Sequence, residues 1–168
     1  MMPTKASSVA LVYDVQALLV RVGVPVRDYL PVVEAIYNPL RQEFDRDLAA
    51  YSERLTTQAD DMILQVNARG TIDDAALADI HAIMVSRDAA IKEAVRTLDA
   101  RRWVQCTNVL TLLQRAAVCA YGRDAQGVDE VIRESTYGHE EGMSYGPRAP
   151  WDAVVYAMLM RLYEFASA

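Results

Sequence analysis

The sequence lacks the short motifs that identify common nucleotide-binding and zinc enzymes. Its seven glycines form neither a Gly-x-x-x-x-Gly-Lys phosphate loop nor a dinucleotide-binding fingerprint. Its two histidines, His81 and His139, are too far apart to form the His-x-x-x-His pair of a zinc protease. No reaction class is indicated by these motifs, and a non-catalytic protein without a cofactor is the preferred interpretation.

Cysteine is also scarce, with two residues in a chain of 168. Cys106 and Cys119 lie on one predicted helix, where 13 residues correspond to about 20 Å. A disulfide requires Cα atoms about 4.4–6.8 Å apart, so both cysteines are predicted to be reduced and buried. A chain without a disulfide framework is typical of the cytoplasm, and a cytoplasmic location is expected.

The chain has no excess of basic residues. It contains 17 Lys and Arg residues and 23 Asp and Glu residues, which give a net charge of −6. Nucleic-acid-binding proteins normally carry a basic face, so no direct binding to nucleic acid is expected. The apolar stretch Val9–Val24 contains Asp14 and Arg21 and is shorter than the ~18–20 apolar residues of a membrane span. We therefore expect no association with a membrane.

The same stretch predicts a helix that is apolar on nearly all sides. Its apolar residues are Val9, Leu11, Val12, Val15, Leu18, Leu19, Val20 and Val22. Such a helix must be central to the fold or covered by a partner. A homodimer is one expectation that follows.

The alternation of apolar and polar residues that is typical of strands is missing. Apolar residues instead recur at the spacing of a helix. One stripe of apolar residues comprises Leu77, Ile80, Met84, Ile91, Val95 and Leu98, and the next comprises Trp103, Cys106, Leu110, Leu113, Ala117 and Ala120. Short connections between long amphipathic helices indicate antiparallel neighbours. The sequence predicts an all-α antiparallel bundle of five to six helices in a single domain, residues 1–168.

Asn38-Pro39 predicts a helix start in the first half of the chain. Asn is a preferred N-cap and Pro a preferred first helical residue. We therefore expect a long helix from Pro39 to Ala68, preceded by a kink and a shorter helix over residues 28–37. Gly70 is expected to stop the long helix in the left-handed conformation.

Glycine is concentrated late in the chain, where five of the seven residues lie between 122 and 146. This concentration predicts a short helix around Val128–Ser135, then an irregular Gly-rich acidic loop over residues 136–149, before the C-terminal helix. Residues 122–168 hold 4 basic and 8 acidic residues, so much of the acid excess lies in this part of the sequence.

This loop and its flanks form the predicted protein-binding surface, since Tyr, Trp, Met and Arg are enriched at interfaces. The candidate residues are Tyr137, Glu140, Glu141, Met143, Tyr145, Arg148 and Trp151. The preferred function is an acidic helical protein that binds another macromolecule, most simply a protein with a basic surface. An inhibitor or immunity protein, a chaperone and an assembly subunit all fit this description.

An enzymatic alternative comes from Arg133 and His139, which form Arg-x5-His. The pair resembles the Arg-x4–6-His element of HEPN-domain ribonucleases, which are small, all-helical and often dimeric. The resemblance implies that Arg133 stabilises phosphate charge and that His139 transfers protons. Glu134 stands where the family has a polar residue, and Gly138 is expected to interrupt the helix that carries the motif. The acids beside His139 lack the spacing of metal ligands, so no metal is expected.

His81 offers a further alternative, a ligand- or tetrapyrrole-binding bundle. It follows Ile80 in the apolar stripe and is expected to be half-buried and hydrogen-bonded to a neighbour. No Cys-x-x-Cys-His attachment motif accompanies it. The composition, in which 15 of the 17 basic residues are Arg, suggests a bacterial or phage source.

Overall fold

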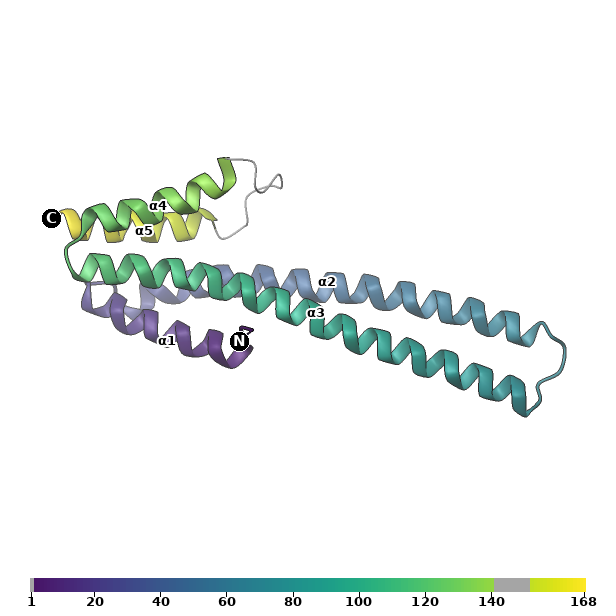
Figure 1. The fold of residues 1–168 in the computed structure, drawn as a ribbon. Coiled ribbons are helices and arrows are strands. Elements are labelled where there is room, and N and C mark those ends of the chain that lie inside the picture. The colour runs from purple at the N-terminus through teal and green to yellow at the C-terminus, as the bar shows by residue number, and fades with distance from the viewer. Residues whose placement is uncertain (1, 141–151) are drawn as a thin grey trace. The chain divides into compact units, whose positions relative to one another are not determined.

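The computed structural model describes residues 2–140 and 152–168, and the side chains of all of these except residues 136–140. Within the described residues the chain forms five helices and no strand (Figure 1). The helices are α1 (Lys5–Arg21), α2 (Val26–Asn67), α3 (Asp74–Tyr121), α4 (Ala125–Glu140) and α5 (Asp152–Ser167). The predicted all-α helical bundle is confirmed.

Local sequence signals explain where several helices begin and end. The backbone N–H of Ser7 donates to Thr4 Oγ1 (3.2 Å) and that of Thr4 donates to Ser7 Oγ (2.8 Å), which is a reciprocal cap at the start of α1. Asp73 caps α3 by accepting from the backbone N–H of Ala76 at 2.9 Å. Gly70 follows α2 with φ +91°, the left-handed conformation expected of a glycine after a helix.

The predicted helix start at Pro39 is wrong, because α2 continues from Val26 to Asn67 with Pro31 and Pro39 inside it. A proline removes one backbone hydrogen bond from a helix and costs about 3 kcal/mol. Ile36 and Leu40, on either side of Pro39, are buried. Their burial offsets this cost, so tertiary packing overrides the local signal.

Helix α3 likewise joins two stripes that the sequence presents separately. It carries the stripe that begins at Leu77 and the stripe that begins at Trp103. The chain divides into two compact units within α2 and α3, one comprising residues 1–41 and 102–168 and the other residues 42–101. We refer to residues 42–101 as the hairpin unit and to the rest as the core unit.

The core unit contains nearly all of the fully buried apolar side chains. Its principal buried residues are Val15, Leu19, Tyr29, Ile36, Leu110, Leu113, Val128, Val131, Leu159 and Leu162. All six members of the stripe from Trp103 to Ala120 are buried. Helix α4 packs against α5 within this unit, so the C-terminal helix is part of the core.

A small polar cluster lies inside the core unit. Ser8 is fully buried; its hydroxyl lies 2.6 Å from the Tyr37 hydroxyl and donates to Cys106 Sγ at 3.2 Å. Burial raises the pKa of Tyr37 to about 12 and also raises the pKa of Cys106. Cys106 and Cys119 are both free, as predicted, but only Cys106 is buried; Cys119 is half-buried, so the prediction of burial is wrong for it. Cys106 is fully buried in the core, and its raised pKa is opposite to the lowered pKa of a nucleophilic cysteine.

The predicted loop begins too early, because α4 extends from Ala125 to Glu140 and includes residues 136–140. Asp124 caps this helix by accepting from the backbone N–H of Gly127 at 2.9 Å. Gly138 lies inside the helix, where a glycine costs only about 1 kcal/mol relative to Ala. The rest of the predicted loop, residues 141–149, lies outside the described residues.

Candidate functional site

The hairpin unit consists of two antiparallel helical segments, the second part of α2 and the first part of α3. Ion pairs join the segments near both ends. Arg69 Nη1 lies 2.7 Å from Asp79 Oδ2 near the turn, and Arg101 Nη2 lies 2.7 Å from Asp47 Oδ2 and 3.2 Å from Glu43 Oε1 at the other end. These pairs hold the register, but they are exposed to solvent and each contributes about 0–1 kcal/mol.

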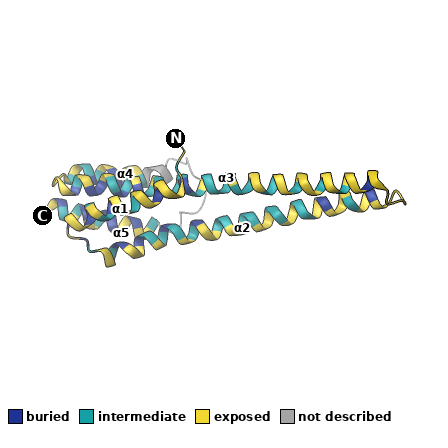
Figure 2. Cartoon of the chain, turned by 90° about the horizontal axis from the view of Figure 1, so that it is seen from below, coloured by how far each residue is buried: buried dark blue, intermediate teal, exposed yellow. Residues whose placement is uncertain are grey.

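The hairpin unit buries few apolar side chains. Only Ala59, Val66 and Ala76 are buried among residues 42–101. No member of the stripe Leu77, Ile80, Met84, Ile91, Val95 and Leu98 is buried, and Leu77 and Met84 remain 54% and 42% exposed. Figure 2 shows the difference as mainly exposed and intermediate colours along this part of α3. We call these six residues the hairpin stripe.

The most exposed apolar residues of this unit lie close to its turn. The large hydrophobic residues exposed by 42–66% are Met62, Leu64, Ile72, Leu77, Met84 and Val85. All lie within 24 residues of sequence centred on the turn, and no other large hydrophobic residue of the hairpin unit is exposed. Concentrated exposed apolar groups of this kind mark sites of interaction with other molecules.

The hairpin unit is also the acidic part of the molecule. It carries 7 basic and 12 acidic residues, a net charge of −5, while the core unit carries 10 and 11. Asp88 and Asp99 follow Met84 and Val95 by four residues each, so they share the side of α3 on which the stripe lies. The hairpin stripe therefore has acidic side chains beside it.

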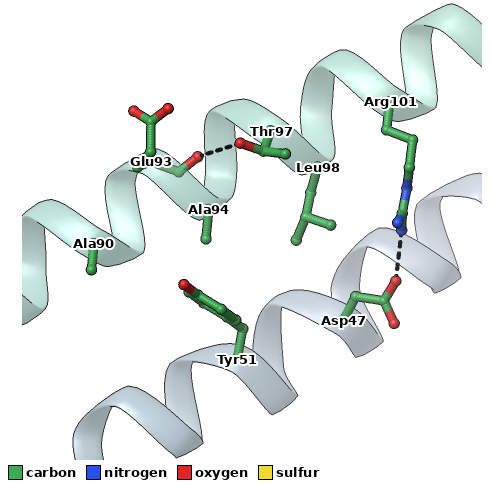
Figure 3. A pocket seen from close by; sticks show the side chains of 8 residues that line it. All are labelled: Asp47, Tyr51, Ala90, Glu93, Ala94, Thr97, Leu98 and Arg101. Atoms are coloured by element: carbon green, nitrogen blue, oxygen red, sulfur yellow. Dashed lines mark hydrogen bonds and ion pairs between the residues drawn. The ribbon is translucent and has the colours of Figure 1, made fainter.

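A groove lies between the two helical segments, and Figure 3 shows the side chains that line it. Its volume is about 500 Å³, and its lining residues are Asp47, Tyr51, Ala90, Glu93, Ala94, Thr97, Leu98 and Arg101. The Tyr51 ring faces Ala90 and Ala94 across the groove. Because the side chains of the two alanines are small, they leave space between the helical segments, and the Tyr51 ring fills part of it.

The polar groups of the groove are largely engaged with one another. Asp47 binds Arg101, and Thr97 Oγ1 donates to the backbone carbonyl of Glu93 at 3.1 Å. Glu93 Oε2 in turn lies 3.4 Å from Arg96 Nη1. A catalytic site needs a nucleophile or base aimed at free space, whereas these groove side chains pair with other protein groups.

A metal site requires several His, Cys, Asp or Glu side chains close together. Across the described residues, no three His, Cys, Asp or Glu side chains come together in a way that would hold a metal ion. His81 is exposed on α3, so the expectation that it is half-buried is wrong. It is not among the residues that line the groove.

The predicted loop surface falls on the part of the chain that is not described. Glu141, Met143, Tyr145, Arg148 and Trp151 lie outside the described residues. Tyr137 and Glu140 belong to the end of α4, without described side chains. This surface therefore stays a prediction.

Arg133 and His139 both lie on α4, so Gly138 does not interrupt the helix between them. The expected interruption is wrong. Arg133 is exposed, and its Nε lies 3.0 Å from Asp129 Oδ2, one helical turn earlier. The Arg-x5-His pair therefore lies on a helix, as the HEPN resemblance requires.

Two features escaped interpretation of the sequence. The first is the incomplete burial of the hairpin stripe, because periodicity identifies an apolar face without revealing what covers it. Gly142-Met143-Ser144-Tyr145-Gly146 fits the Gly-x-Ser-x-Gly pattern of serine hydrolases, which requires a strand before the serine. The described residues contain no strand, and this segment lies outside them, so it carries no assignment.

A scan of family models, a search of curated proteins and a search of solved structures each found no match. Among the described residues, no helix combines the length and the apolar character needed to cross a bilayer.

Proposed function

We propose that the protein is a non-catalytic binding protein, and that its hairpin unit takes a basic amphipathic helix of another protein. The observation that carries this proposal is the incomplete burial of the hairpin stripe, in which Leu77 and Met84 are exposed and the other four residues are only half-buried. The stripe runs over the 21-residue interval from Leu77 to Leu98, which is about 32 Å of helix. A partner helix of similar length, with apolar residues on one face, would cover it.

The charge of the hairpin unit supports a basic partner. A net charge of −5 attracts a basic surface and accelerates its association. The same charge repels nucleic-acid phosphates. It also opposes pairing of this surface with a second copy of itself, because two acidic surfaces would be brought together.

Binding to two designed peptides tests the proposal. One is a helical peptide of about six turns with leucines on one face and lysines on the other, and the matched peptide has glutamates in place of the lysines. We expect the basic peptide to bind and the acidic peptide to bind at least tenfold more weakly, as measured by isothermal titration calorimetry. Equal affinity for the two peptides would contradict the proposed role of charge.

Substitutions locate the contact. The double variant Leu77→Asp with Met84→Asp should bind the basic peptide at least tenfold more weakly, because it places charge in the apolar contact. Val118→Asp is the matched control, since Val118 is 55% exposed but belongs to the core unit. If the control variant loses as much affinity as the double variant, the stripe is not the binding surface.

The residues between Tyr137 and Trp151 that the sequence identifies as a protein-binding surface are a second surface of the same proposed function. The acids Glu140 and Glu141 and the aromatic residues Tyr137, Tyr145 and Trp151 suit a basic protein partner. The double variant Tyr145→Ala with Glu141→Lys should weaken binding to a native partner and leave helical content unchanged. Affinity that is unchanged in this variant removes this second surface from the proposal.

A ribonuclease is the second candidate function, favoured by the position of Arg133 and His139 on one continuous helix. In that function Arg133 would stabilise phosphate charge and His139 would transfer a proton. Purified protein should then cleave RNA, and both Arg133→Ala and His139→Ala should abolish the cleavage. Cleavage that survives His139→Ala eliminates this candidate.

A further inference from the structure

The groove beside Tyr51 lies at one end of the hairpin stripe. Leu98 belongs to both, and Ala94 and Ala90, which also line the groove, lie one and two helical turns before it on α3. A partner helix that covers the stripe therefore also passes over the groove. The groove volume of about 500 Å³ falls within the range of about 300–1,000 Å³ that is typical of ligand pockets, so the groove has room for a large side chain of that helix.

Charge is distributed unevenly along the hairpin unit. Residues 55–86, which we call the turn half, hold 1 basic and 5 acidic residues, whereas residues 42–54 and 87–101, the groove half, hold 6 basic and 7 acidic residues. The turn half also contains all the exposed large hydrophobic residues of the unit. The basic residues of a partner are therefore attracted to the turn half, while the part of the partner that lies over the groove half meets nearly balanced charge.

The ionisable groups around the groove disfavour a charged side chain inside it. A cation would meet Arg101, which lines the groove, and Arg54, whose guanidinium lies 4.8 Å from the centre of the Tyr51 ring. Asp47 is already bound by Arg101, and Figure 3 shows the Glu93 carboxylate pointing away from the Tyr51 ring. An anion would be repelled by the net charge of −5 on the hairpin unit. An uncharged side chain meets neither obstacle.

The apolar lining of the groove favours a flat side chain. The Tyr51 ring faces Ala90 and Ala94 (Figure 3), and Leu98 adds a further apolar group. The small alanine side chains leave space beside the tyrosine ring. Two aromatic rings attract each other when they are offset or edge to face, and aromatic side chains that fill a pocket are common anchors of protein interfaces.

We infer that the groove takes one uncharged aromatic side chain of the partner helix, while the basic residues of that helix lie over the turn half. This inference rests on the proposed binding function and adds to it a place for each kind of side chain. The 17 residues from Leu77 to Ala94 correspond to about 26 Å of helix. The aromatic residue and the basic residues therefore belong to opposite ends of the partner.

Three designed peptides test the inference on the full chain. Each is a helix of about six turns with leucines along one face and with its lysines confined to one half. The reference peptide keeps every leucine, the second has Trp in place of the last leucine of the uncharged half, and the third has Trp in place of a leucine of the lysine half. By isothermal titration calorimetry, the second peptide should bind at least tenfold more tightly than the reference, and the third should gain less than about twofold.

A substitution that fills the groove locates the aromatic side chain. In Ala94→Leu the advantage of the second peptide over the reference should fall below about threefold, because the added side chain occupies the space beside Tyr51. Ala89→Leu is the matched control, since Ala89 is exposed on the same helix and does not line the groove, and it should keep the full advantage. Tyr51→Leu, which removes the ring and keeps an apolar side chain, should reduce the advantage as well. An advantage that is undiminished in both groove variants overturns the inference.

The peptides separate failure of this inference from failure of the proposed function. If the reference peptide binds and the second peptide binds no more tightly, the groove takes no aromatic side chain and the proposed function stands. An equal gain for the third peptide overturns the assignment of the two ends. If none of the three peptides binds, the proposed function is wrong, and the inference is wrong with it.

Discussion

The two parts of helix α3 have the same kind of apolar stripe in different surroundings. From Trp103 to Ala120 every stripe residue is buried in the core unit, whereas from Leu77 to Leu98 none is buried. Two helices side by side cover only part of each other's apolar face, and a third layer is needed to remove the rest from water. The difference shows that periodicity specifies an apolar face, while topology decides whether the chain itself covers it.

The comparison predicts a large difference in stability between matched leucine substitutions. Leu110→Ala should lower the free energy of unfolding by about 2–5 kcal/mol, because it leaves a cavity at a fully buried site. Leu77→Ala should change it by about 0.5 kcal/mol or less, because the side chain is already half-exposed. Urea unfolding followed by circular dichroism measures both. Equal losses of unfolding free energy in the two variants would mean that the hairpin stripe is as well buried as the stripe from Trp103 to Ala120.

A smaller effect is expected from the polar cluster that only the core unit contains. Ser8→Ala removes the partner of the Tyr37 hydroxyl and of the Cys106 thiol. Leaving buried polar groups unpaired costs about 1–3 kcal/mol, which should appear as a loss of stability to urea. Ser7→Ala, at the exposed neighbouring cap residue, is the control and should cost about 1 kcal/mol. A loss for Ser8→Ala no greater than the control would show that the cluster is accessible to water.

The sequence predicts the helices better than it predicts their breaks and surroundings. The all-α class, the free cysteines and the stop at Gly70 follow from local chemistry that the structure retains. The predicted helix start at Pro39 is wrong because burial of the neighbouring Ile36 and Leu40 compensates for the proline within one continuous helix. The candidate site could not be found from the sequence, since the residues near Leu77 and those near Leu110 have the same spacing. Only the arrangement of the other helices separates a core stripe from an uncovered one.

The smallest expected effect concerns ion pairs, which both units possess on their surfaces. In the core unit, Arg115 forms two hydrogen bonds with the Glu134 carboxylate at 3.1 and 2.9 Å. Hydrogen bonds from Arg115 lower the pKa of Glu134 from its ordinary value of 4.5. The folded state therefore holds this proton less tightly than the unfolded state. The stabilisation is present above the ordinary pKa and is lost as the pH falls through the lowered value.

Glu134→Gln should thus cost about 0.2–1 kcal/mol at neutral pH, as expected for an exposed pair, and nothing in strong acid. Asp47→Asn, which removes a partner of Arg101 in the hairpin unit, should cost a similarly small amount. The measurement is the free energy of unfolding for both variants at neutral pH, with Glu134→Gln repeated across the acid range. Equal small losses would show that exposed ion pairs do not distinguish the units, so that the contrast along α3 depends on burial of apolar side chains. A loss of several kcal/mol at Asp47 alone would instead make charge pairing the main support of the hairpin.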